Sequence, residues 1–213
     1  MFGVSGLTGD VLWTQSVEGG DGSAPAVTES GVYGSWACVQ AYKFAPDTGQ
    51  ALWHYDSWCS GGGGMTPALI ANRLYAPDFA GAGPLVLDPL TGESLGTFAS
   101  DGTPAGTAQT VFVMKSGALM AFPHGSSTAT WTVPGLGYSS APIVVGAHVV
   151  VGTNTSKKVV VVSAATGELV SSDLLEAAVT AGGDVGYVGA PLSGLAAANN
   201  HLFVPAGQYL YSY

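Results

Sequence analysis

The sequence predicts an all-β protein, a β-propeller made of four-stranded antiparallel blades. A segment consisting of an apolar strand, a turn ending in Thr-Gly and a second strand recurs with a period of roughly 40 residues, as expected for a blade. Its clear copies lie at Leu7–Trp13, Asp47–Trp53, Leu90–Leu95 and Ala165–Val170, and a degenerate copy lies at 125–131. The 32 glycines and 12 prolines suit short strands joined by many tight turns.

Each repeat is expected to open with a strand that follows a small residue and a proline. These prolines are Pro25, Pro67, Pro104, Pro142 and Pro191. Proline is tolerated at the first residue of a strand. A second apolar strand follows, and a third precedes the Thr-Gly turn, at 42–44, 85–87, 119–122, 159–162 and 209–211. With the strand after the turn, each repeat supplies the four strands of one blade.

The turn carries the most regular residues of the repeat. Glycine suits a turn position with positive φ, and an aspartate such as Asp88 can accept backbone N–H groups in an Asx-turn. Ser5 and Ser163 occupy the place of Asp88, whereas Ala45 does not, so its turn must be held differently. The residues that define the motif are Thr8, Gly9, Trp13, Thr48, Gly49, Trp53, Asp88, Thr91, Gly92, Trp131, Thr166 and Gly167.

The whole chain, 1–213, is expected to form one domain. Its repeats run roughly over 5–44, 45–87, 88–122, 123–162 and 163–213. The N-terminal strand is expected to complete the C-terminal blade, because Val4 and Tyr213 occupy the same phase of the repeat. A closed ring of about five blades and a part of a larger seven- or eight-bladed propeller both agree with this phase. The stretch 171–189 is longer than its counterparts and is expected to be an inserted loop with a helical turn near 174–179.

This pattern resembles the pyrroloquinoline-quinone (PQQ) repeat over essentially the whole chain. Asp88 with Thr91-Gly92, and the Thr-Gly turns that precede Trp13 and Trp53, carry the resemblance best. The resemblance implies a propeller in which the tryptophan docks between adjacent blades. Trp131 lacks its Thr-Gly, and Ser171 stands where a fourth tryptophan is expected. The motif is structural in that family, whose members include quinoprotein dehydrogenases and non-enzymatic scaffolds.

The composition argues against several partners and favours export. The formal net charge is −9, and only five Lys and Arg residues are present, too few for a nucleic-acid surface or an anionic membrane. No apolar run approaches the roughly 18 residues of a membrane helix, so we expect no membrane insertion. The N-terminus has no signal-peptide pattern. The low charge nevertheless favours an extracellular, periplasmic or cell-envelope location.

Two interpretations of the cysteines, Cys38 and Cys59, remain open. An even number of cysteines in a chain that looks secreted allows one disulfide. Two free thiols remain the alternative. Metal binding is less favoured, because no further cysteine or histidine lies at ligand spacing.

Candidate catalytic residues are scarce. The sequence has no nucleophile-elbow motif, and the four histidines are far apart. The acidic residues lie mostly in turns, where turn chemistry explains them. Asp78 and Asp101 are weak candidates for calcium ligands together with loop carbonyls. The adjacent cysteine pair of quinoprotein dehydrogenases, implied by the resemblance, is absent, so we expect neither PQQ nor calcium as a cofactor.

The favoured function is therefore a non-enzymatic binding or scaffold module that meets a protein or glycan partner on a propeller face. Tyrosines and tryptophans in excess of those needed for docking support such a surface. The alternative is a fragment of a PQQ-dependent dehydrogenase, in which PQQ and calcium would be bound. A second alternative, a carbohydrate-binding or carbohydrate-active propeller, depends only on the aromatic and acidic residues.

Overall fold

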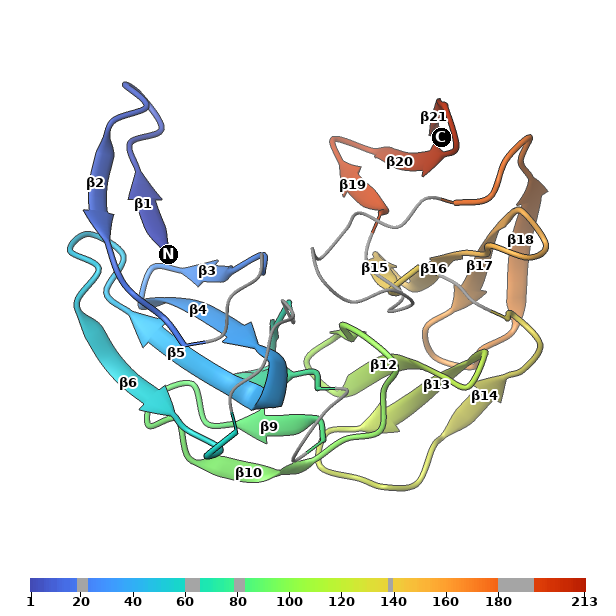
Figure 1. Ribbon diagram of the computed structural model, residues 1–213. Coiled ribbons are helices and arrows are strands. Elements are labelled where there is room, and N and C mark those ends of the chain that lie inside the picture. Colours follow the sequence, from blue (N-terminus) through green and yellow to red (C-terminus); the bar gives the residue numbers. More distant parts are fainter. Residues whose placement is uncertain (19–22, 60–65, 79–82, 138–139, 180–193) are drawn as a thin grey trace. The chain divides into compact units, whose positions relative to one another are not determined.

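A computed structural model describes residues 1–18, 23–59, 66–78, 83–137, 140–179 and 194–213 (Figure 1). The regular elements in these ranges are β strands and one short 3₁₀ turn, and the strands form sheets with antiparallel neighbours. This confirms the predicted fold class. The described residues form two compact units, Met1–Thr97 and the described residues from Phe98 onward.

The first unit contains one two-stranded and two four-stranded sheets. The two-stranded sheet pairs β1 (Phe2–Val4) with β2 (Val11–Thr14). The first four-stranded sheet has the order β3 (Ala26–Thr28), β4 (Gly31–Trp36), β5 (Gln40–Phe44) and β6 (Ala51–Tyr55), with the 3₁₀ turn η1 (Ala37–Val39) between β4 and β5. The second has the order β7 (Ala68–Ile70), β8 (Arg73–Ala76), β9 (Leu85–Leu87) and β10 (Ser94–Thr97).

The second unit contains two four-stranded sheets and one three-stranded sheet. The first sheet consists of β11 (Ala105–Gly106), β12 (Thr110–Lys115), β13 (Ala118–Pro123) and β14 (Trp131–Val133). The second consists of β15 (Ile143–Val145), β16 (His148–Gly152), β17 (Lys158–Ser163) and β18 (Leu169–Leu174). The third consists of β19 (Ala196–Ala198), β20 (His201–Ala206) and β21 (Tyr209–Ser212).

In every sheet the strands are neighbours in chain order, as Figure 1 shows for β3 to β6. The core lies on the inner strands: all residues of β4, β5 and β9 are buried. In two of the four-stranded sheets the last strand is the most exposed, and every residue of β10 and β18 is exposed. Strands buried on both faces are expected where one blade packs against the next, and polar residues of these strands, such as Ser35, Gln40 and Lys43, are buried with them.

The predicted helical turn at 174–179 is wrong. Leu174 ends β18, and the following residues run without helix to Val179, which forms an isolated bridge with Ala206. Leu175 and Val179 are buried against Val204. Burial of these two side chains in the core explains the apolar spacing that suggested a helix.

The predicted completion of the C-terminal blade by the N-terminal strand stays a prediction. Within the described residues, β1 pairs with β2, and β21 pairs with β20.

Candidate functional site

Three tryptophans form the same contact with a following Thr-Gly turn, which we call an indole clamp. Each indole N–H donates to a backbone carbonyl in the next sheet along the chain. The three bonds are Trp13 Nε1 to Pro46 O at 2.7 Å, Trp53 Nε1 to Pro89 O at 3.2 Å and Trp131 Nε1 to Ala164 O at 3.2 Å. The clamps thus place these tryptophans between neighbouring sheets within each unit.

The glycine of each clamped turn is required by the close approach of the indole. A Cβ atom added to Gly49 would lie 2.5 Å from Trp13, and one added to Gly167 would lie 2.7 Å from Trp131. Both glycines also have φ near +70°, at +68° and +74°, a region that side chains with a Cβ rarely adopt. Gly92 faces Trp53 in the same way, at 2.8 Å.

The turns themselves are closed by a shared backbone pattern and by variable side chains. Asp88 Oδ1 accepts the N–H groups of Leu90 and Thr91, at 2.7 and 3.2 Å, and forms the predicted Asx-turn. In the turn without such a side chain, Ala45 O accepts Gly49 N–H at 2.9 Å and Ala45 N–H donates to Gln50 O at 2.8 Å. The turn at Ala45 therefore closes without an Asx side chain, with the Thr48 hydroxyl accepting the Gln50 N–H at 3.3 Å.

A second cluster gathers around the disulfide that the structure forms between Cys38 and Cys59. Cys38 lies in the turn between β4 and β5, and Cys59 lies beyond β6, so the bond ties two loops of one sheet. The Ser57 hydroxyl donates to the carbonyl oxygen of Cys38. The cysteines thus belong to a loop cluster, which we define as Cys38, Gln40, Asp56, Trp58 and Cys59.

Gln40 is the centre of the loop cluster and is 1% exposed. Its Nε2 donates to Asp56 Oδ1 at 3.0 Å and to the carbonyl oxygen of Cys59 at 2.8 Å. Its Oε1 lies 2.7 Å from His54 Nε2. Because an amide oxygen can only accept, the His54 proton resides on Nε2 in this arrangement.

Stacked aromatic rings pack against the loop cluster through His54, which contacts Gln40. The His54 and Tyr42 rings stack, with centroids 4.0 Å apart and planes within 6°. Trp36 meets Tyr42 edge-on at 5.8 Å. The Tyr42 hydroxyl accepts the backbone N–H of Glu18 at 2.9 Å, and burial raises the pKa of the Tyr42 phenol. The side chains that hold the loops are therefore packed in fixed positions.

Trp58 is the most exposed large side chain of the cluster, at 93%. Its backbone is nevertheless fixed, because its N–H donates to Asp56 Oδ1 at 2.8 Å and the next residue is the disulfide-bonded Cys59. The hydrogen bond from the Gln40 side chain, and then that from the Trp58 backbone, lower the pKa of the Asp56 carboxyl.

Asp78, one of the two predicted calcium candidates, contacts the turn that carries Cys38. Its Oδ1 accepts the Cys38 N–H at 3.0 Å, and the residue is 3% exposed. Cys38 and Val39 both have positive φ, at +66° and +53°. This conformation is costly for a β-branched residue, so the contacts to Cys38 compensate for local strain.

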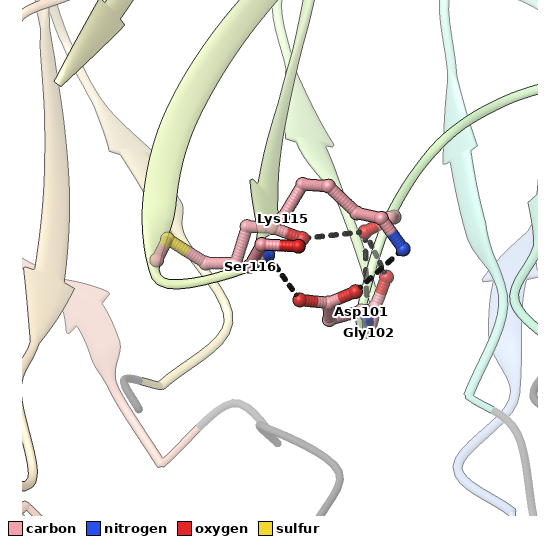
Figure 2. Close-up of polar contacts among 6 residues, drawn as sticks. Asp101, Gly102, Lys115 and Ser116 are labelled. Atoms are coloured by element: carbon pink, nitrogen blue, oxygen red, sulfur yellow. Dashed lines mark hydrogen bonds and ion pairs between the residues drawn. The ribbon is translucent and has the colours of Figure 1, made fainter. Parts of the chain in front are cut away.

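Asp101, the second calcium candidate, lies in the second unit and fastens a hairpin turn (Figure 2). Its Oδ1 lies 2.8 Å from Lys115 Nζ, and its Oδ2 accepts Ser116 N–H at 2.5 Å. Ser116 has a φ of +50° and begins the turn between β12 and β13. Figure 2 shows the carboxylate of Asp101 pointing at both groups. Asp101 therefore acts as a turn anchor.

Neither calcium candidate belongs to a set of metal ligands among the described residues. Asp78 and Asp101 belong to different units. In the ranges given above, no group of three His, Cys, Asp or Glu side chains could hold a metal ion. The carboxylates instead bond to the backbone N–H of Cys38 and to Lys115 and Ser116.

Gln40 and Asp56 are residues that sequence reasoning missed. Neither belongs to a motif, and their contact depends on the pairing of β5 with β6. One available signal was Trp58-Cys59 followed by the glycines 61–64, which indicates a loop that could face a ligand. Residues 60–65 lie outside the described ranges.

Comparison with known proteins defines the class. The profile of the family described as "Outer membrane protein assembly factor BamB" matches residues 3–168 and, in an overlapping match, residues 39–212. The chain therefore belongs to this family of PQQ-like repeat propellers. A search of curated proteins finds no match.

Solved structures support the same fold. BamB from Moraxella catarrhalis superimposes with a TM-score of 0.70 at 18% identity, over 99% of this chain and 65% of that one. The computationally designed Ika8 protein gives 0.67 at 18% identity, over 97% and 62%. Sqt1 from Saccharomyces cerevisiae gives 0.69 at 10% identity, over 95% and 62%. The chain thus spans less than two thirds of each of these propellers.

Among the described residues, no helix has the length and apolar character needed to cross a membrane.

Proposed function

We propose that this chain is a protein-binding scaffold module of an exported or cell-envelope protein, and that it binds its partner through the loop cluster around Trp58. The observation that carries the proposal is an indole that is 93% exposed on a fixed backbone. Exposed tryptophans of this kind are enriched among the residues that dominate protein–protein binding energies.

The loop cluster is suited to binding because its conformation is set before a partner arrives. The disulfide, the two hydrogen bonds of Gln40 Nε2 and the turn at Asp56 restrain the segment that carries Trp58. A loop that is already ordered loses less conformational entropy on binding. The same contacts are not needed to close the strands, which are paired independently.

Family membership supports the class of partner. The family description names outer-membrane protein assembly, and such an activity requires contacts with other envelope proteins. The low charge of the chain is consistent with contacts made mainly by apolar and aromatic side chains. A protein that takes part in outer-membrane protein assembly is therefore the first partner to test.

Site-specific photocrosslinking tests the proposal. A benzophenone amino acid is placed at position 58 or, as a control, at position 174, where Leu174 is also exposed on β18. The exported protein is irradiated in a Gram-negative cell, and crosslinked partners are identified by mass spectrometry. We expect an envelope protein to be crosslinked from position 58 alone, and competition by unlabelled wild type but not by Trp58→Ala. Equal crosslinking from both positions would contradict the proposal.

A further inference from the structure

Asp56 and Trp58 bring a carboxylate and an indole together in one turn of the loop cluster. The Trp58 N–H donates to Asp56 Oδ1 at 2.8 Å, which is the contact of an Asx-turn. Both residues are exposed, and the exposed fraction of Trp58 is 93%. A partner that reaches the indole therefore also meets the carboxylate.

The Asp56 carboxylate is held from the protein side and stays ionised. Its Oδ1 accepts Gln40 Nε2 at 3.0 Å as well as the Trp58 N–H. Hydrogen bonds of this kind favour the charged form of a carboxyl, and they lower the pKa of Asp56. Oδ2 makes no hydrogen bond with the described residues. An ionised oxygen atom is thus left for a donor that comes from outside.

The described basic side chains of the first unit do not neutralise this charge. They are Lys43 and Arg73. Lys43 is 5% exposed, and its ammonium lies 5.4 Å above the Tyr33 ring. Arg73 begins β8 in another sheet, and neither side chain forms an ion pair with Asp56. The formal net charge of the chain is −9, which attracts cationic groups over a longer range.

The charge of Asp56 decides which partner group fits over Trp58. An apolar side chain on the indole would remove the carboxylate from water without compensation, which is costly. An acidic side chain would be repelled. A cation is attracted both to the face of an indole and to a carboxylate. Arginine suits the pair best, because its planar guanidinium can stack on a ring and donate N–H groups from its edge.

We propose that the loop cluster binds an arginine side chain of its partner, with the guanidinium stacked on the Trp58 indole and an N–H donated to Asp56 Oδ2. The inference rests on the proposed function and names the chemistry of the partner segment. Trp58 supplies the ring face, Asp56 supplies the charge, and Gln40 is a positioning residue that acts through Asp56.

An NMR titration tests this arginine site without the partner. The probe is N-acetyl-arginine amide, and N-acetyl-citrulline amide is the matched control, because it has nearly the same shape and no charge. We expect saturable shifts of the Trp58 indole and backbone N–H signals with the arginine probe. The citrulline probe should bind about tenfold more weakly.

Three outcomes of this titration would overturn the inference. The first is equal binding of the arginine and citrulline probes. The second is the absence of any saturable shift at Trp58. The third is equal or tighter binding of N-acetyl-leucine amide or N-acetyl-glutamate amide, which would indicate an apolar or an acidic partner segment instead.

Two variants of the protein separate a local charge effect from a general one. Asp56→Asn removes the charge and keeps a side-chain oxygen for Trp58 and Gln40, so it should weaken binding of the arginine probe about tenfold. Asp10→Asn removes one exposed carboxylate from another turn of the same unit and should leave binding unchanged. Equal weakening in both variants would assign the effect to net charge and overturn the inference.

Photocrosslinking from position 58 distinguishes failure of this inference from failure of the proposed function. The crosslinked partner segment should contain an arginine, and its replacement by glutamine should reduce crosslinking severalfold. A crosslinked segment without arginine would overturn the inference and leave the scaffold function standing. The absence of any envelope crosslink would overturn the scaffold function and the inference with it.

Discussion

At the scale of single residues, the glycine of a clamped turn determines whether the neighbouring indole can dock. Gly49→Ala combines a side chain at positive φ with a Cβ 2.5 Å from Trp13. We expect a loss of about 3 kcal/mol in the free energy of unfolding, of which about 1 kcal/mol is backbone strain. Urea denaturation measures the loss.

The matched control for this variant is Gly135→Ala. Gly135 has a φ of +77°, and an added Cβ would meet no described atom within 4 Å. It should therefore lose only the backbone part, about 1 kcal/mol. Equal losses at Gly49 and Gly135 would show that the indole contact contributes little.

The Asp56 carboxyl is expected to titrate below its ordinary range. Hydrogen bonds from the Gln40 side chain and the Trp58 backbone favour its charged form and lower its pKa. The contribution of a carboxyl with a depressed pKa is present above the unfolded value near 3.9 and is lost as the pH falls through the folded value. A ¹³C NMR titration of Asp56 should show a midpoint below that of an ordinary aspartate.

The variant Gln40→Met provides the control for this titration. It keeps the side-chain length and removes the amide that donates to Asp56. The Asp56 midpoint should then rise toward the ordinary carboxyl value. An unchanged midpoint would assign the shift to the backbone N–H of Trp58 instead.

At the scale of the element, the disulfide joins two loops of one sheet across 21 positions of sequence. The double variant Cys38→Ser, Cys59→Ser releases this restraint on the unfolded chain. A loss of about 3 kcal/mol in the free energy of unfolding is expected for a loop of this length. Chemical denaturation with and without reductant measures it.

Reductant is the internal control for that variant. It should lower the stability of the wild type by the same amount and leave the double variant unchanged. If the reduced wild type stayed as stable as the oxidised protein, the strained turn at Cys38 and Val39 would have to be held by Asp78 and Ser57 alone.

The hairpin between β7 and β8 offers a stabilising change. Its turn residues, Ala71 and Asn72, both have positive φ, at +47° and +57°, which is the type I′ pattern that favours Asn and Gly. Ala71→Asn should therefore raise the free energy of unfolding by about 0.5–1 kcal/mol. Ala147→Asn, in the turn where only Gly146 has positive φ, should give no such gain in the same denaturation experiment.

At the scale of the whole molecule, the proposed scaffold function and the quinoprotein alternative differ in ligand response. A ligand that binds only the folded chain stabilises it by about 2.7 kcal/mol at a hundredfold excess over its Kd. We expect PQQ with calcium to leave the thermal midpoint in place. A rise of several degrees that requires both additions would favour the dehydrogenase alternative.

The sequence predicted the propeller class well because the repeat is carried by local turn chemistry. Positive φ at Gly49, Gly92 and Gly167, and the Asx-turn at Asp88, follow from residue type and spacing alone. The contacts made by Gln40 and Asp56 could not be found in this way, because they depend on strand register and on loop packing. The predicted helix at 174–179 was wrong because burial of Leu175 and Val179 reproduces a helical spacing.

The indole clamps also make the intrinsic tryptophan fluorescence of the protein a report on its conformation. The clamped rings of Trp13, Trp53 and Trp131 lie between neighbouring sheets, whereas Trp58 is exposed to water. Their fluorescence should therefore separate into a blue-shifted group and one red-shifted emitter that acrylamide quenches first. Separation of two neighbouring sheets would expose a clamped tryptophan and shift its emission to the red. Binding of a partner at the loop cluster would bury Trp58 and shift its emission to the blue, so the two events can be told apart without an attached dye.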